Sequence, residues 1–276
     1  MTPPALDQIS DAAFAGIARL LYQTAGIQLS EHKKTMMVTR LRKRLLHLEL
    51  DSFDAYLRYL KQGDKQELQY MLDLMSTNET YFFREAEHFK VLAQELRSQP
   101  RKHWRIWCAA LSSGEEAFTI GMLAQDILGS DNWSLVGTDI SSRMVEKARR
   151  AIYPESMLEK IPEYYRKHFC LRGSGEYSGF FTFIPAIRSA IDCRLMNLTK
   201  PLAGIGPFDI VFIRNVLIYF DADTKAQVIT RMLPLISKGG LIVTGHSESL
   251  FGVSEHLHTV QPSVYRYLPN EQMASV

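Results

Sequence analysis

The chain has 276 residues, enough for one large domain or two smaller ones, and its hydrophobic content of 46% and charged content of 22% are typical of a globular protein. A net charge of +2 excludes a polyelectrolyte, so any basic function must come from a local patch. No apolar run approaches the roughly 20 residues of a membrane span, and neither a signal peptide nor cysteines at CxxC spacing are found, so we expect a cytoplasmic protein.

Residues 10 to 75 predict helices only, because their apolar residues recur at helical spacing. Ser10 and Ser30 are the expected N-caps of the first two helices. Two further helices are expected, one after Ser52 and one from Glu67 to Met75. The second helix has the apolar stripe Met37, Leu41, Leu45 and Leu48. We therefore predict a small all-α domain over residues 1–76.

Residues 77–103 are interpreted as a linker and a lid helix. Polar Asn78, Thr80 and Arg84 lie beside aromatic residues 81–83, a mixture that suggests a lid over a ligand at a domain junction. The planar guanidinium of Arg84 is suited to holding a carboxylate. The alternative is a surface arginine that covers an aromatic core.

From residue 104 to 276 strands alternate with helices, which predicts an α/β domain with a doubly wound parallel sheet. The strands are expected at 104–109, 135–139, 208–213, 241–244 and 264–267, and the helices at 116–128, after Ser141, and at 222–235. Between about 160 and 195 three glycines separate short β-branched and aromatic pieces. We interpret this part as an inserted small antiparallel β-subdomain, in the form of a hairpin with an exposed edge.

The turn at 112–116, between the first strand and its helix, is the most informative segment. A small-residue turn at this place presents backbone N–H groups to a ligand. It has one glycine, Gly114, where a dinucleotide-binding turn has three, and its Glu115 and Glu116 would repel a pyrophosphate. A cationic ligand with hydroxyls fits better, and S-adenosylmethionine has an ammonium, a sulfonium and a ribose.

Two carboxylates near this turn are candidates for holding such a ligand. Asp139 ends the second strand, where a carboxylate can accept hydrogen bonds from both ribose hydroxyls; the alternative is a helix N-cap shared with Ser141. Glu116 could pair with the amino group of the ligand, or it could stabilise only the helix dipole, a contribution of about 0.3–1 kcal/mol.

Polar residues after two further strands point to the same edge of the sheet. Asn197 and Leu198 could contact the adenine edge, although a turn-forming asparagine is an equal alternative. Arg214 and Asn215 directly follow a continuous apolar strand, where ligands of open α/β sheets bind. The Tyr219 hydroxyl could position an attacking group, unless this residue is an ordinary loop aromatic.

A local basic patch lies in the second helix, without acidic residues between positions 32 and 48. This density of positive charge favours an acidic partner, either nucleic acid or an acidic protein helix, over a merely solvated face. The patch consists of Lys33, Lys34, Arg40, Arg42, Lys43 and Arg44. The histidines form no recognisable catalytic or metal-binding spacing, so we expect no metal.

With these motifs placed, the sequence resembles the CheR-type chemoreceptor glutamate methyltransferases from about residue 10 to 267. Several motifs in a fixed order carry the resemblance: residues 77–84 (TNETYFFR), 113–116 (SGEE), 139–140 (DI), 197–198 (NL), 212–221 (FIRNVLIYFD), 239–240 (GG) and 246–249 (HSES). Ala117 departs from the family, which usually has proline after the two glutamates, and Leu111 departs from its small-residue run and is expected to narrow the pocket.

The resemblance implies a helical N-terminal domain followed by a class I (Rossmann-like) methyltransferase domain with an inserted β-subdomain. It implies methyl transfer from S-adenosylmethionine to glutamates of receptor cytoplasmic helices, which gives methyl esters and S-adenosylhomocysteine in chemotaxis adaptation. The implied cofactor residues are Asn78, Thr80, Arg84, Glu116, Asp139, Asn197, Leu198, Arg214 and Asn215. We expect Arg84 and Tyr219 to orient the incoming carboxylate.

Receptor binding is expected at two surfaces. Arg40, Lys43 and Arg44 would dock an acidic receptor helix. The β-subdomain could add a strand to a C-terminal receptor tail, and neither nucleic acid nor membrane insertion is expected. The rival interpretations are a nicotinamide-dependent oxidoreductase, a methyltransferase of RNA or another acidic partner, and a non-catalytic module that senses S-adenosylmethionine.

Overall fold

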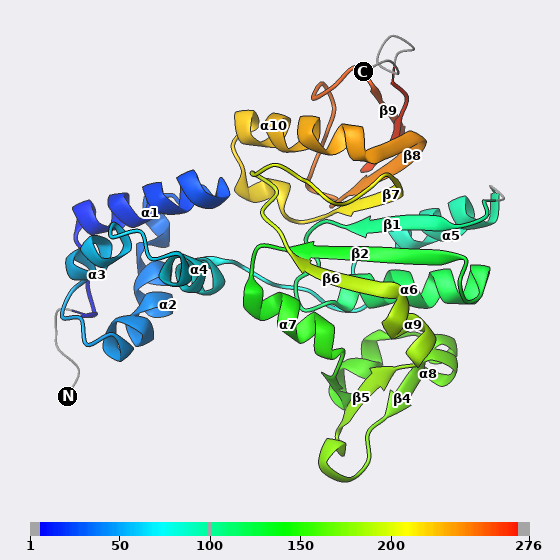
Figure 1. Ribbon diagram of the computed structural model, residues 1–276, viewed down its shortest axis with the longest axis horizontal. Helices are drawn as coiled ribbons and strands as arrows, with labels where there is room; N and C mark the ends of the chain where they lie inside the picture. Colours follow the sequence, from blue (N-terminus) through cyan, green and yellow to red (C-terminus); the bar gives the residue numbers. More distant parts are fainter. Residues whose placement is uncertain (1–5, 99–100, 270–276) are drawn as a thin grey trace.

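The computed structural model describes residues 6–98 and 101–269. Four α-helices form the N-terminal domain, at the blue end of the chain in Figure 1: α1 (Asp11–Ala25), α2 (Lys34–His47), α3 (Phe53–Leu60) and α4 (Lys65–Met75). Their apolar stripes enclose a core of their own, which includes Ile17, Leu41, Tyr56 and Met71. The predicted all-α character of this region is confirmed.

The helix starts follow local capping chemistry. Ser10 and Ser52 accept hydrogen bonds from the backbone N–H groups three residues on, as predicted. Ser30 caps no helix through its side chain, so that prediction is wrong: a 3₁₀ turn, η2 (Glu31–Lys33), lies between Ser30 and α2. Asp64 caps α4, which therefore begins two residues before the expected start.

The remainder is built on a seven-stranded sheet with the order β6-β2-β1-β7-β8-β10-β9. The first five strands in this order are parallel, while β10 pairs antiparallel with β8 and with β9. The strands are β1 (Trp104–Cys108), β2 (Trp133–Asp139), β6 (Ile191–Leu195), β7 (Phe208–Ile213), β8 (Ile236–Thr244), β9 (Leu257–Gln261) and β10 (Val264–Tyr267). The predicted parallel α/β sheet is confirmed, although β9, whose residues are mostly exposed, was not predicted.

Helices cover both faces of the sheet (Figure 1). One core cluster joins α5 (Glu87–Ser98), α6 (Glu115–Leu128) and α7 (Ser142–Arg150) to the sheet, and a second joins α10 (Ala222–Met232), which continues into the 3₁₀ helix η6 (Leu233–Leu235). Because α5 packs its apolar face into the first cluster, it is a core helix and not the predicted lid. No described helix has the length and apolarity needed to cross a membrane.

An inserted subdomain lies beneath the main sheet in Figure 1. Its antiparallel strands follow the order β3 (Tyr153–Pro154), β5 (Phe180–Phe183), β4 (Cys170–Arg172). The other elements are η3 (Glu155–Lys160), α8 (Glu163–Phe169), η4 (Gly175–Tyr177) and α9 (Pro185–Ala190). The predicted hairpin over 160–195 is thus corrected: the small sheet starts at Tyr153, has a third strand, and ends before β6, the edge strand of the main sheet.

Candidate functional site

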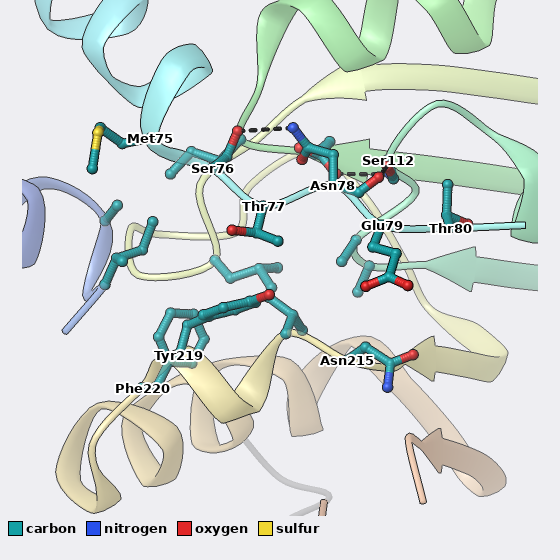
Figure 2. Close-up of a pocket in the computed structure, with 18 of the residues that line it drawn as sticks. Met75, Ser76, Thr77, Asn78, Glu79, Thr80, Ser112, Asn215, Tyr219 and Phe220 are labelled. Atoms are coloured by element: carbon teal, nitrogen blue, oxygen red, sulfur yellow. Dashed lines mark hydrogen bonds between the residues drawn. The ribbon is translucent and has the colours of Figure 1, made fainter. Parts of the chain in front are cut away.

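A pocket lies at the carboxyl edge of the parallel strands, against the N-terminal domain, and encloses about 1220 Å³ that is partly open to solvent (Figure 2). Parallel strands all point to this edge, so residues far apart in the sequence meet there. Every predicted cofactor or catalytic residue lines the pocket: Asn78, Thr80, Arg84, Glu116, Asp139, Asn197, Leu198, Arg214, Asn215 and Tyr219.

The helical domain forms part of the wall, which sequence reasoning missed. The backbone N–H of Gln28 donates to the carbonyl of Tyr219 at 3.1 Å, and Asn197 Nδ2 donates to the Thr24 carbonyl at 2.6 Å. The end of α1, the start of α2 and the segment between them also line the pocket, through Ala25, Ile27, Leu29, Lys33 and Met36. Their place in the pocket wall was hard to predict, because most of these residues are apolar and their spacing is that of core residues.

Hydrogen bonds fix the segment after α4 at the carboxyl edge of the sheet. Ser112 Oγ donates to the Asn78 carbonyl at 3.1 Å, and Asn78 Nδ2 donates to Ser76 Oγ at 3.0 Å (Figure 2). Arg40, on α2, donates to the carbonyls of Met75 and Ser76. The extended chain at 76–80, not α5, therefore forms this wall.

The turn between β1 and α6 requires its glycine. Gly114 has φ of 104°, and a Cβ there would lie 2.6 Å from the Tyr153 hydroxyl. Two N–H groups of this turn are used within the protein, since Ser112 N donates to Asp139 Oδ2 and Gly114 N to the Leu111 carbonyl. The expectation that the turn offers N–H groups to a ligand is therefore wrong for these two. Leu111 is buried in the core and does not line the pocket, so it does not narrow it.

Asp139 is buried at the end of β2 and joins two segments. Its two carboxylate oxygens accept from Ser112 N and Ser141 N, each at 2.8 Å. Burial raises the pKa of Asp139 above its ordinary value, and these backbone donors offset part of that effect. Ser141, whose side chain accepts from Met144 N, is the helix N-cap, so Asp139 is not. Each oxygen of Asp139 keeps capacity for a further hydrogen bond.

Arg214 links two carboxylates behind the pocket. Its side chain is 1% exposed, with Nη1 at 2.5 Å from Glu116 Oε2 and Nη2 at 3.0 Å from Glu85 Oε2. Burial disfavours its charge, but Glu116 and Glu85 outweigh this and raise the pKa of Arg214. Two carboxylates share one guanidinium, so this group of three side chains has one negative charge in excess, which favours a cationic ligand beside it.

Two acidic residues of this region were not predicted. Glu85 accepts from Asn215 Nδ2 at 3.3 Å besides its ion pair with Arg214. Glu248 accepts from the backbone N–H groups of Asn215, Ile218 and Gly245, and so holds Asn215 at φ of 57°. Glu85 directly follows the motif at residues 77–84, and Glu248 lies within the motif at residues 246–249. Their places at these motifs are the signal that could have identified them.

Arg84 and Tyr219 both line the pocket. Arg84 is half-buried, and its Nη1 donates to the Glu79 carbonyl at 2.5 Å. The Tyr219 ring lies along the pocket floor in Figure 2, and its hydroxyl has no hydrogen-bond partner within residues 6–98 and 101–269. Both side chains therefore keep polar groups available to a ligand.

The basic patch of α2 is largely compensated within the protein. Arg44 pairs with buried Glu67, which also accepts from the Tyr56 hydroxyl, while Arg40 donates to backbone carbonyls. Lys34 and Arg42 pair with Asp11 and Asp7. The expectation that the six charges are unneutralised is wrong for Lys34, Arg42 and Arg44, because their acidic partners come from other segments. Lys43 is exposed and forms no ion pair with any described residue.

The structure also brings together two histidines and a glutamate. Glu85, His88 and His246 have potential ligand atoms that all lie within 4.8 Å of one another. The expectation that no histidine occurs at metal-ligand spacing overlooked Glu85-x-x-His88, three residues apart.

Comparison with known proteins identifies the family of the chain. Residues 78–266 match the family model "CheR methyltransferase, SAM binding domain", and residues 12–76 match "CheR methyltransferase, all-alpha domain". The protein is thus an S-adenosylmethionine-dependent methyltransferase with a class I methyltransferase domain, as its sheet and pocket indicate. The chain belongs to the CheR methyltransferase family, and the predicted fold class and cofactor are confirmed.

Curated relatives match along nearly the whole chain. The chemotaxis protein methyltransferase of Escherichia coli is 38% identical over 245 residues, which cover 87% of this chain and 85% of that protein. That of Salmonella typhimurium is 36% identical over 263 residues, covering 93% and 90%. Chemotaxis protein methyltransferase 2 of Pseudomonas aeruginosa is 36% identical over 257 residues, covering 91% of each chain.

Proposed function

We propose that this protein transfers the methyl group of S-adenosylmethionine to glutamate side chains in the cytoplasmic helices of chemoreceptors. The observation that carries the proposal is a single pocket that all of the predicted cofactor residues line and that adjoins the Arg214–Glu116–Glu85 group, which has one negative charge in excess. The names of the relatives support a chemotaxis receptor as the substrate.

The proposed cofactor contacts follow from the chemistry of each group. Asp139 accepts from the ribose hydroxyls with its remaining lone pairs. Asn197 and Leu198 bind the adenine edge, and Glu116, which is ion-paired with Arg214, holds the amino group. Asn78, Thr80, Arg84 and Asn215 complete the lining. The excess negative charge supports this assignment, because the donor has an ammonium and a sulfonium.

The reaction requires alignment and not a general base. S-adenosylmethionine supplies an electrophilic sulfonium methyl when it is bound. A substrate glutamate has an ordinary pKa of about 4.3 and is ionised at neutral pH. Arg84 and Tyr219, with their free polar groups at the opening, orient the incoming carboxylate, and the surrounding walls exclude water.

These two roles are tested by single-turnover methyl transfer. The Tyr219→Phe and Arg84→Ala variants should each bind the cofactor and transfer methyl more slowly than the wild type. Wild-type rates in both variants would show that the orienting roles are wrong.

Two surfaces are proposed for receptor binding. Lys43 offers an exposed positive charge on α2, next to the structurally tied Arg40 and Arg44. The outer strand β4 of the small sheet pairs on one side only, so its other edge has backbone groups for an added strand. If a receptor tail binds at this edge, a receptor truncated at its C-terminus should bind the protein more weakly than the full-length receptor does.

Tritium transfer decides among the substrates. The protein is incubated with methyl-tritiated S-adenosylmethionine and either receptor-containing membranes or RNA. Base-labile label on the receptor protein is expected, since carboxyl methyl esters hydrolyse in base. Label on RNA alone, or no transfer with intact cofactor binding, would favour the RNA methyltransferase or the sensor interpretation instead.

A further inference from the structure

The cluster of Glu85, His88 and His246 lies outside the pocket lining and has no role in the proposed methyl transfer. Glu85 follows the pocket segment, His88 is in the first turn of α5, and His246 follows β8. The distance from Glu85 Oε2 to His88 Nδ1 is 3.4 Å and to His246 Nε2 is 3.8 Å, and the centroids of the two imidazole rings are 4.6 Å apart.

His88 provides a second, independent observation. Its side chain is only 2% exposed, and neither ring nitrogen has a hydrogen-bond partner. Burying a polar group without a partner costs free energy, so an unpaired buried imidazole calls for a ligand.

We propose that Glu85, His88 and His246 form a Zn²⁺ site. Zinc ligands lie about 2.0–2.2 Å from the ion, which places tetrahedral ligand atoms roughly 3.4 Å apart. Glu85 and His88 already have this spacing, and the His246 side chain, 55% exposed, is free to move in. Two imidazoles and one carboxylate suit zinc, whereas Mg²⁺ and Ca²⁺ prefer oxygen ligands only. The fourth position is left to water.

Arg214 is the positive group that opposes a cation here. It lies 3.0 Å from Glu85 Oε2, but it also pairs with Glu116 and donates to the Arg84 carbonyl at 2.7 Å. Arg214 therefore keeps two partners if Glu85 turns to the metal. This movement removes Glu85 from Arg214 and Asn215, both of which line the pocket.

A consequence, which rests on the proposed function, is that zinc and the cofactor oppose each other. Zinc adds positive charge beside a pocket proposed to bind a cation. It also withdraws the Glu85 carboxylate from Arg214, which lines that pocket. By linkage, each ligand lowers the affinity of the other by the same factor, and couplings of about 5-fold or more are common.

The metal site is tested by calorimetric titration of the full-length, chelator-treated protein with Zn²⁺. One ion per chain is expected, with no binding of Mg²⁺. His246→Ala should weaken Zn²⁺ binding at least about 10-fold, since it removes one of three ligands. The matched control is His258→Ala, another exposed histidine, which should bind as the wild type does. Thermal unfolding without metal checks that both variants are folded.

Absence of one-to-one Zn²⁺ binding, or equal affinities for the wild type and His246→Ala, would overturn the site. The antagonism is measured by titrating S-adenosylhomocysteine with and without saturating Zn²⁺. A roughly 5-fold weaker affinity is expected in the wild type and no change in His246→Ala. An unchanged affinity in the wild type would overturn the antagonism. A failure to bind S-adenosylhomocysteine even without metal would instead contradict the proposed function.

Discussion

Two sites with basic side chains, one at Arg214 and one on α2, differ in what surrounds those side chains. Arg214 is 1% exposed and shared by Glu85 and Glu116, which leaves negative charge in excess beside the pocket. In α2, Arg44 pairs with Glu67, while the neighbouring Lys43 faces solvent. The first site adjoins the pocket proposed for the cofactor, whereas the second combines a cation in an internal ion pair with an exposed cation that has no ion pair among the described residues. Charge type alone does not separate these roles; burial and partners do.

Removal of the shared arginine should have the largest effect. Arg214→Leu leaves the partly buried carboxylates of Glu85 and Glu116 without their counter-ion, so the free energy of unfolding should fall by about 3 kcal/mol and cofactor binding should be lost. Denaturant unfolding and calorimetry measure the two effects. Lys90→Ala is the control, since its pair with Glu87 is 73% and 66% exposed and contributes about 0–1 kcal/mol. Equal losses of unfolding free energy in Arg214→Leu and Lys90→Ala would contradict the special role of the buried arginine.

The structural pair in the helical domain comes next. Glu67 is 1% exposed and accepts from both Arg44 and the Tyr56 hydroxyl. Glu67→Gln removes the charge and one acceptor and should lower the free energy of unfolding by about 2 kcal/mol. Because this network lies away from the pocket, the affinity for S-adenosylhomocysteine should stay unchanged. A loss of affinity without a loss of stability would contradict the structural role.

At the ribose end of the pocket, a smaller effect on binding is expected. Asp139→Asn keeps the shape but replaces one acceptor oxygen by a donor, so affinity for S-adenosylhomocysteine should fall about 10-fold, or about 1.4 kcal/mol. Wild-type affinity in this variant would remove Asp139 from the cofactor contacts. Ser237→Ala, on β8 away from the pocket lining, is a control that should bind normally.

The raised pKa of Asp139 predicts that cofactor affinity depends on pH. Burial raises the pKa of Asp139, so as the pH falls its carboxylate in the free protein protonates before an ordinary aspartate does. Cofactor affinity should therefore decline as the pH falls through this raised pKa, and the decline should be weaker in Asp139→Asn. The sign for stability is opposite: a raised pKa in the folded state means that ionising Asp139 costs stability as the pH rises. Titrations over a pH series measure the affinity.

The smallest effect concerns receptor docking. Lys43→Glu should weaken receptor binding a few-fold at low salt and leave the unfolding free energy within about 0.5 kcal/mol, because the side chain is exposed. Arg44→Glu should also weaken binding, but with a loss of stability, since it faces Glu67. Binding that is insensitive to both changes would eliminate α2 as the docking surface.

The sequence predicted the sheet well because its signals are local. The apolar run of β7 and the caps Ser10, Ser52 and Ser141 need no tertiary information. The pocket residues were also predictable, since the ends of parallel strands converge at one edge. The three-stranded subdomain sheet was misjudged because β3 has two residues and α9 has six, too short for any periodicity.

Charge compensation could not be predicted, because it depends on distant partners. Glu67 lies 23 positions from Arg44, and Arg214 lies 130 positions from the Arg84 carbonyl that it contacts. The same holds for Glu85 and His246, which are 161 positions apart. Only the folded chain shows which cations are free and which histidine is unpaired.

A crystal structure of the protein soaked with S-adenosylhomocysteine tests the central claim most directly. The account predicts the ligand in the pocket at the carboxyl edge of the sheet, with its ribose at Asp139 and its amino group at Glu116. An empty pocket, or the same ligand bound elsewhere on the chain, would contradict it.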